Sequence, residues 1–186
     1  IDRQNKLEHP PLVATIGFFD CVHTGHRFLI NQVKDEATKR GLPSAVITFP
    51  VHPRKVLQKD YQPALLCGYD EKIEQLATTE IDYCVMLDFT VDISKLSAYQ
   101  FMKNILKEKL NVDTLLIGYD HRFGHNREEG FEDYRKYGKE LNIDVIEASE
   151  LPGDDHVSSS RIRKQLAYGL VCKAARILSY NYPISG

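Results

Sequence analysis

Short runs of apolar, β-branched residues alternate with longer amphipathic stretches along this chain of 186 residues. Such alternation is typical of βαβ units stacked around a parallel sheet. Most of the short runs are continuously apolar, as expected when helices cover both faces of a sheet. The pattern predicts an α/β protein with five parallel strands, at residues 12–17, 45–49, 83–88, 114–118 and 144–148.

Between these runs apolar residues recur at helical spacing, as in Phe101, Ile105 and Leu110. The spacing predicts helices at residues 27–39, 70–79, 97–110, 131–141, 161–168 and 171–179. Two segments, 50–68 and 118–129, interrupt the alternation. Because long connections in such folds are more often binding loops than accidents, we expect substrate contacts in both.

Composition narrows the class of protein further. The chain has 24 Lys and Arg against 26 Asp and Glu, which argues against a nucleic-acid partner, since general phosphate-backbone binders carry a large positive excess. It holds no apolar run of about 18 residues and begins without an apolar signal core, so we expect a cytoplasmic protein of one domain with no membrane association. The cysteines stand far apart without a C-x-x-C pair and are predicted to be reduced thiols: Cys21, Cys67, Cys84 and Cys172.

The first predicted strand runs into a turn that ends in His23, Thr24, Gly25 and His26 and then becomes a helix. Ligands of open α/β sheets bind at the carboxyl ends of strands, where a following helix offers unpaired N–H groups to an anion. Two histidines at this spacing could instead be structural residues or metal ligands. The glycine between them and the strand-to-helix setting favour a phosphate site.

A second candidate phosphate site opens the helix predicted at 161–168. Its preceding serines are good N-caps, which suffices to explain one of them. Arg161, Arg163 and Lys164 in a first helical turn would each oppose the helix dipole by about 0.3–1 kcal/mol, so we expect a bound anion to compensate them. A solvated cationic face is the alternative.

The segment 118–127 mixes glycines, an acid, histidines, arginines and aromatic residues, which suits an aromatic heterocycle that bears a phosphate. A polar surface turn is the alternative, and for the proline-rich segment 48–54 the spacing does not decide between binding and turn formation. The chain lacks the P-loop, G-x-G-x-x-G and G-x-S-x-G motifs, which argues against a P-loop kinase, a dinucleotide-dependent dehydrogenase and an α/β-hydrolase.

These motifs resemble those of the H-x-G-H nucleotidylyltransferases, and most closely the FMN adenylyltransferase module of the bacterial bifunctional riboflavin kinase/FAD synthetases. The similarity rests on four segments in the family's order: 17–26, 48–54, 118–124 and 158–163. The resemblance implies a Rossmann-like fold with a five-stranded parallel sheet. It also implies an FMN adenylyltransferase domain at 1–180 and a linker at 181–186 toward a riboflavin kinase domain that this chain lacks.

The resemblance further implies the reaction of FMN with ATP and Mg²⁺ to give FAD and pyrophosphate. Alternatives are an adenylyl- or cytidylyltransferase for a different phosphate monoester, or a nucleotide- or flavin-binding module without catalysis. The residues that match the family's motifs are catalytic His23, His26 and Arg163; ATP-binding Gly17, Phe18, Asp20, Gly25, Ser159 and Ser160; and FMN-binding Pro53, Arg54, Asp120, Arg122 and Phe123, with no metal-ligating residue.

Three positions depart from the family's pattern. Cys21 stands where glycine is usual, which predicts strain if the position requires a positive φ. His121 replaces a usual phenylalanine on the flavin side, and Ser160 stands where threonine is common.

Overall fold

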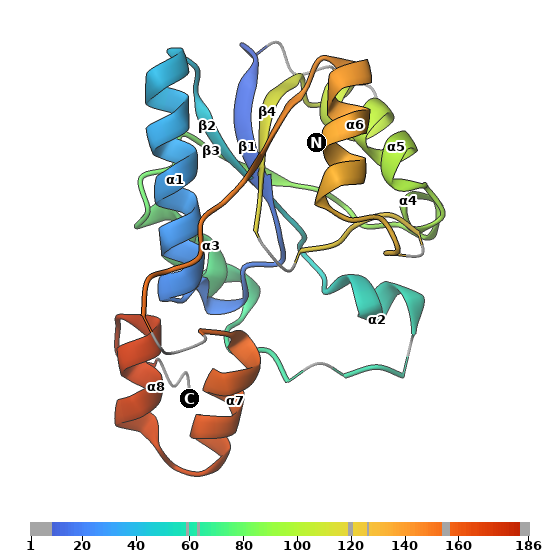
Figure 1. The fold of residues 1–186 in the computed structure, drawn as a ribbon. Helices are drawn as coiled ribbons and strands as arrows, with labels where there is room; N and C mark the ends of the chain where they lie inside the picture. Colours follow the sequence, from blue (N-terminus) through green and yellow to red (C-terminus); the bar gives the residue numbers. More distant parts are fainter. Residues whose placement is uncertain are drawn as a thin grey trace.

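The predicted sheet forms as one five-stranded, all-parallel sheet in a computed structural model, which describes residues 9–58, 60–62, 64–118, 121–125, 127–153 and 157–182. The strands are β1 Leu12–Ile16, β2 Ser44–Thr48, β3 Tyr83–Met86, β4 Val112–Ile117 and β5 Asp144–Glu147. Their order is β3-β2-β1-β4-β5, so the order of connection reverses between β1 and β4. All carboxyl ends meet at the lower edge of the sheet in Figure 1. The predicted α/β fold with a five-stranded parallel sheet is confirmed.

Helices cover both faces of the sheet (Figure 1). α1 and α3 pack on one face, whereas α4, α5 and α6 pack on the other. α2 and the antiparallel pair of α7 and α8 lie beyond the carboxyl ends of the strands (Figure 1). The helices are α1 Thr24–Arg40, α2 Pro53–Leu57, α3 Tyr69–Ala77, α4 Val91–Ser94, α5 Ala98–Phe101, α6 Phe131–Leu141, α7 Ser159–Ala167 and α8 Val171–Leu178.

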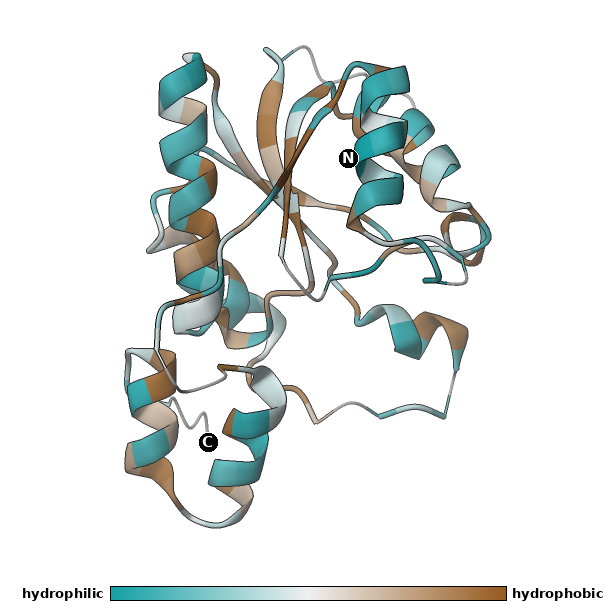
Figure 2. Cartoon of the chain, viewed as in Figure 1, coloured by the Kyte–Doolittle hydropathy of each residue, from teal (hydrophilic) through white to brown (hydrophobic). Residues whose placement is uncertain are grey.

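The central strand shows why most of the predicted strands are continuously apolar. Every residue of β1 is buried. Leu12, Ala14 and Ile16 belong to the main core under α5 and α6, and Val13 belongs to the core under α1. Figure 2 shows the same division, with apolar strands between helices whose outer faces are hydrophilic. A sheet buried on both sides requires this pattern.

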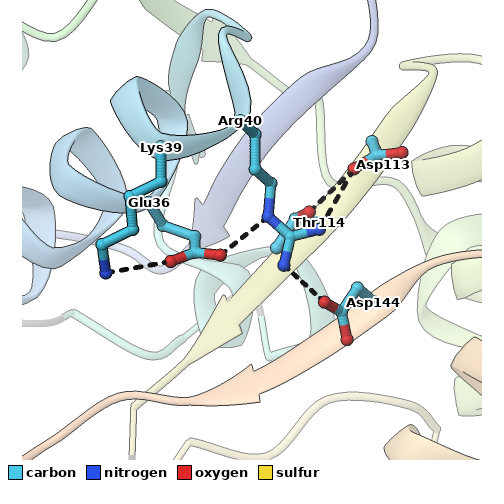
Figure 3. A network of polar contacts seen from close by, with 6 residues as sticks. All are labelled: Glu36, Lys39, Arg40, Asp113, Thr114 and Asp144. Atoms are coloured by element: carbon cyan, nitrogen blue, oxygen red, sulfur yellow. Dashed lines mark hydrogen bonds and ion pairs between the residues drawn. The ribbon is translucent and has the colours of Figure 1, made fainter.

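Charged residues tie α1 to the amino ends of β4 and β5, opposite the edge where ligands are expected (Figure 3). The Arg40 guanidinium contacts Glu36 at 2.7 Å, Asp144 at 2.5 Å and Asp113 at 3.6 Å. The cation lies in the last turn of α1, where it also complements the helix dipole. This network fixes the end of α1 that is remote from the candidate site.

The helices differ from the prediction in three places. α2 and α4 are short helices that the sequence did not predict; Pro53 starts α2, where its fixed φ and missing N–H are tolerated. The segment predicted as one helix at 97–110 divides into α5 and a π-helical stretch, Met102–Lys107. There the Glu108 and Leu110 amides bond to carbonyls five residues earlier. No helix in the described part of the chain is long and apolar enough to cross a membrane.

Candidate active site

The turn between β1 and α1 has a strained backbone. Phe19, Cys21 and Val22 have φ values of 53°, 59° and 36° without being glycine. Each left-handed residue of this kind costs on the order of 1–3 kcal/mol and persists only where surrounding contacts impose it. The strain predicted at Cys21 is therefore confirmed, and residues 17–23, which we call the approach loop, must be held by tertiary contacts.

Asp20 supplies buried contacts of this kind, with 4% of its surface exposed. Its carboxylate accepts hydrogen bonds from the Leu66 amide at 3.0 Å and from Arg163 Nη2 at 3.0 Å. Burial raises the pKa of Asp20, and the bonds from Leu66 and Arg163 act against that rise. The Tyr180 hydroxyl donates to the Cys21 carbonyl at 2.5 Å, which adds a contact from the segment that follows α8.

The two histidines of the motif lie against each other at the start of α1, as the spacing predicts. His23 is the N-cap, and its Nδ1 accepts a hydrogen bond from the His26 amide at 3.3 Å. The two rings stack with centroids 3.6 Å apart and 14° between their planes. The pair therefore stands at the positive end of a 17-residue helix, where unpaired amides attract an anion.

Both imidazoles are neutral near neutral pH. Burial lowers the pKa of His23 to about 4, and burial together with the neighbouring His23 lowers the pKa of His26 well below its usual range. Because His23 Nδ1 accepts a hydrogen bond, its proton resides on Nε2, which makes Nε2–H a donor. His26 Nδ1 is buried without a partner among the described residues. The pair can thus donate hydrogen bonds to a phosphate without carrying a fixed charge.

The second predicted phosphate site lies at the start of α7. Its cationic residues differ from the prediction in their positions along the helix and in their partners. Ser158 is the N-cap and accepts from the Arg161 amide, so Arg163 and Lys164 fall beyond the first turn. Arg163 donates to the Ala64 carbonyl at 2.6 Å as well as to Asp20. The predicted placement of Arg163 and Lys164 in the first turn is therefore wrong, whereas Arg161 does lie there. Asp20 balances the charge of Arg163 without a ligand, and the bound anion at this helix end stays a prediction.

The serines of this motif lie at the beginning of α7, with Ser159 partly buried and Ser160 exposed. Ser160 Oγ is 3.5 Å from Arg163 Nη1. The structure therefore brings Arg163 into direct contact with Asp20 and places the Ser160 hydroxyl beside its guanidinium.

Of the glycines predicted to contact ATP, Gly17 begins the approach loop and Gly25 lies two residues after its end. A Cβ atom on Gly17 would lie 3.0 Å from the Phe19 ring, and one on Gly25 would lie 3.4 Å from the His23 ring. Phe18 is partly buried, and the His52 ring packs edge-on against it at 4.7 Å. These residues surround the end of β1.

The residues predicted for FMN follow β2 and β4, the two neighbours of β1. Pro53 and Arg54 open α2, and Arg54 is exposed. Arg122 is half-buried, whereas Phe123 is 9% exposed and stacks on Tyr134 at 4.2 Å. In this structure Phe123 anchors its loop in the main core, rather than presenting a ring to solvent. The predicted contact Asp120 lies outside the described residues.

Lys72 at this edge was missed by the sequence-based prediction. Its side chain is 3% exposed, and its ammonium donates to the Phe49 carbonyl at 2.6 Å and to the Phe18 carbonyl at 3.5 Å. Burial lowers its pKa. The available signal was its place on α3, four residues before buried Leu76, which puts a lysine on the apolar face of an amphipathic helix.

The cysteines are free thiols, as predicted. Cys21 and Cys67, which are far apart in sequence, belong to one small core that also holds Ile162 and Leu178. In the part of the chain that the structure describes, no group of three or more His, Cys, Asp or Glu side chains could hold a metal ion.

Comparison with known proteins decides the family. The model of the FAD synthetase family matches residues 5–161. The chain belongs to the FAD synthetase family. The resemblance drawn from the four motifs is thereby confirmed, and Tyr180 lies beyond the segment that the family model matches.

Curated relatives of this FAD synthetase family member are bifunctional riboflavin kinase/FMN adenylyltransferases. The protein from Escherichia coli K12 is 35% identical over 94% of this chain and 56% of its own length. Those from Listeria monocytogenes and Pseudomonas fluorescens are each 33% identical, over 94% and 97% of this chain and over 55% and 58% of their own lengths. The chain thus spans little more than half the length of these relatives.

A solved structure shares the fold. The crystal structure of a protein described as a macrolide-efflux protein from Streptococcus pneumoniae superposes with a TM-score of 0.81 at 26% identity. The superposition covers 96% of this chain and 69% of that protein.

Proposed function

We propose that this chain transfers the adenylyl group of ATP to the phosphate of FMN and releases pyrophosphate. The observation that carries the proposal is the stacked pair of neutral histidines at the amino end of α1, beside the Asp20–Arg163 contact. Membership of the FAD synthetase family and the FMN adenylyltransferase names of the relatives supply the substrates. Mg²⁺ would enter with the phosphates of ATP.

In the proposed reaction an FMN phosphate oxygen attacks the α-phosphorus of ATP, and the bond from that phosphorus to the bridging oxygen breaks. A phosphate monoester is already an adequate nucleophile, so no covalent enzyme intermediate is needed. The remaining requirements are alignment of the two substrates and stabilisation of the charge that moves onto pyrophosphate. Bound Mg²⁺ would neutralise part of that charge.

The residues at the end of β1 would meet the second requirement. His23 Nε2–H and the free amides at the start of α1 would donate to the phosphates, and His26 would act from the adjoining ring. Arg163, with Ser159 and Ser160, would approach from α7. For Arg163 to reach a phosphate it must share its donors with Asp20 and Ala64, which hold it without ligand.

The flavin would lie across the loops that follow β2 and β4. We assign Pro53 and Arg54 to one side, and Arg122 with the loop that Phe123 anchors to the other. Asp120 remains part of this proposal. Ligands of open parallel sheets bind where the strand order reverses, and in this fold that point lies between β1 and β4.

The test is chromatography of the products after the purified chain is mixed with FMN, ATP and Mg²⁺, together with an assay for pyrophosphate. FAD and pyrophosphate should appear in equal amounts, and His26→Ala should abolish most of both. Reactions with CTP, or with other phosphate monoesters in place of FMN, are the matched comparisons. Faster turnover of another monoester, or flavin binding without pyrophosphate release, would refute the proposal.

A further inference from the structure

Lys72 is a buried cation that the proposed chemistry does not use. Among the described residues it forms no ion pair with a carboxylate; its ammonium donates to the main-chain carbonyls of Phe18 and Phe49. A buried charge is costly unless hydrogen bonds satisfy it. An apolar side chain could fill the same space, but only a multiple donor can tie two carbonyls together.

The two carbonyls belong to the ends of adjacent strands, where the sheet stops pairing them. The hydrogen bond from the Gly17 amide to the Ile47 carbonyl, 3.0 Å long, marks the end of backbone pairing between β1 and β2. Beyond it, Thr48 Oγ1 donates to the Phe18 carbonyl at 3.0 Å and Lys72 donates to the carbonyls of Phe18 and Phe49. Side-chain hydrogen bonds thus replace backbone pairing at the point where the loops that follow β1 and β2 diverge.

A ring contact strengthens the same junction. The Lys72 ammonium lies 4.2 Å from the centroid of the Phe18 ring, and the His52 ring packs on Phe18 at 4.7 Å. His52 is the N-cap of α2, with its Nδ1 accepting from the Arg54 amide. Lys72 is therefore linked through Phe18 to the approach loop and through Phe49 and His52 to the start of α2.

We propose that Lys72 is a positioning residue for adenylyl transfer, which fixes the approach loop relative to the start of α2. This inference rests on the proposed function, because the approach loop would hold ATP and α2 would contact FMN. In-line attack requires reacting atoms about 3–3.5 Å apart, and a displacement of about 1 Å can lower the rate about 100-fold. A residue that sets this separation should affect the joint geometry of the substrates more than the affinity for either one.

The test compares Lys72→Met with Lys34→Met. Lys34 is a matched control, since its ammonium also donates to a carbonyl, that of Thr79 at 2.8 Å, but from α1 and away from both loops. Lys72→Met should lower kcat about 10- to 100-fold. The dissociation constants of ATP alone and FMN alone, measured by calorimetry, should each change by less than about threefold, which is within the effect of a small change in contacts. Lys34→Met should retain the wild-type kcat.

A second measurement does not depend on activity. Amide hydrogen exchange should increase at residues 17–22 and at 49–54 in Lys72→Met and should stay at the wild-type rate there in Lys34→Met. If Lys72→Met does not fold, Lys72→Gln, which keeps an amide donor on a shorter side chain, is measured in the same way.

The outcomes separate this inference from the proposed function. If the wild-type chain forms no FAD, the proposed function fails whatever the variants do. If the wild type is active, a wild-type kcat in the Lys72 variant refutes the positioning role. A fall in kcat matched by equal weakening of ATP and FMN binding, or by an equal fall in Lys34→Met, also refutes it, because it indicates general destabilisation.

Discussion

Acid should lower the free energy of unfolding of the ligand-free protein because His23 is buried in its neutral form. The size of the effect follows from the pKa of His23. The side chain is 5% exposed, and burial lowers its pKa from 6.5 to about 4. Between these values the unfolded chain binds a proton that the folded chain does not. The contribution to stability is therefore complete above pH 6.5 and is lost as the pH falls through 6.5 toward 4.

The magnitude follows from the pKa difference. At 1.36 kcal/mol for each pKa unit, the lowering from 6.5 to about 4 corresponds to about 3 kcal/mol of free energy of unfolding. Burial lowers the pKa of His26 too, which adds to the loss in the same pH range. Since a domain is stable by only about 5–15 kcal/mol, the loss is a large fraction of the total.

Urea unfolding at about pH 7.5 and about pH 4.5 measures this difference. The control is His23→Asn, because asparagine is a good N-cap whose amide oxygen can accept the His26 N–H bond but cannot titrate. Since pH 4.5 lies above the folded pKa of about 4, most but not all of the effect falls within this interval, and the variant should lose about 2–3 kcal/mol less free energy of unfolding than the wild type. Equal losses in the two proteins would refute the assignment of His23 as a buried neutral group.

Four further predictions concern the site and its support. His26→Ala should lower the rate of FAD formation about 100-fold or more in steady-state assays, because it removes one preorganised group beside the phosphates. Arg163→Ala should lower the free energy of unfolding without ligand by about 1–2 kcal/mol in denaturant titrations, because it leaves the buried Asp20 carboxylate without its cation. The loss is modest because the guanidinium is partly exposed. The same variant should weaken ATP binding. Arg122→Ala should weaken FMN binding more than ATP binding in separate titrations. Gly138→Ala should destabilise the fold by about 1–3 kcal/mol in thermal melting, because a Cβ would lie 2.5 Å from the Ile143 carbonyl.

Other results would contradict each of these. Wild-type turnover in His26→Ala would remove the histidine pair from the mechanism. Unchanged stability of Arg163→Ala would mean that its contact with Asp20 contributes nothing. Loss of ATP binding alone in Arg122→Ala would place the two substrates the other way round, and a wild-type melting temperature in Gly138→Ala would show that α6 and β5 can separate without cost.

The strands could be predicted because their physical cause is local. Most are short, largely apolar runs, and every residue of β1 and β2 is buried, as expected for strands covered on both faces. The short helices α2 and α4 could not be predicted, because four or five residues do not complete enough turns to show a helical period. The π-helical stretch had no signal of its own, since its apolar spacing resembles that of an ordinary helix.

The candidate site was predictable only in part, because some of its contacts are local in sequence and others depend on how distant segments pack. The pairing of His23 with His26 follows from their spacing on one helix end, and the positive φ of Cys21 follows from the glycine usual at that position. The Asp20–Arg163 contact joins residues 143 positions apart, and only the packing of α7 against the approach loop brings them together. Lys72 was missed because its partners are carbonyls, which every residue carries and no sequence pattern marks.

The strand order also bears on how the chain folds during synthesis. β1 is the central strand, yet one of its neighbours is β4, with Val13 beside Thr114 about 100 residues later. At a ribosomal rate of about 5–20 residues per second, β1 waits roughly 5–20 s for that neighbour to be made. Meanwhile one edge of a largely apolar strand remains unpaired, and unpaired apolar edges are where nascent chains aggregate. The strand order that reverses beside β1 in the finished protein therefore leaves the same strand of the growing chain unpaired on one side for the time that β4 takes to be made.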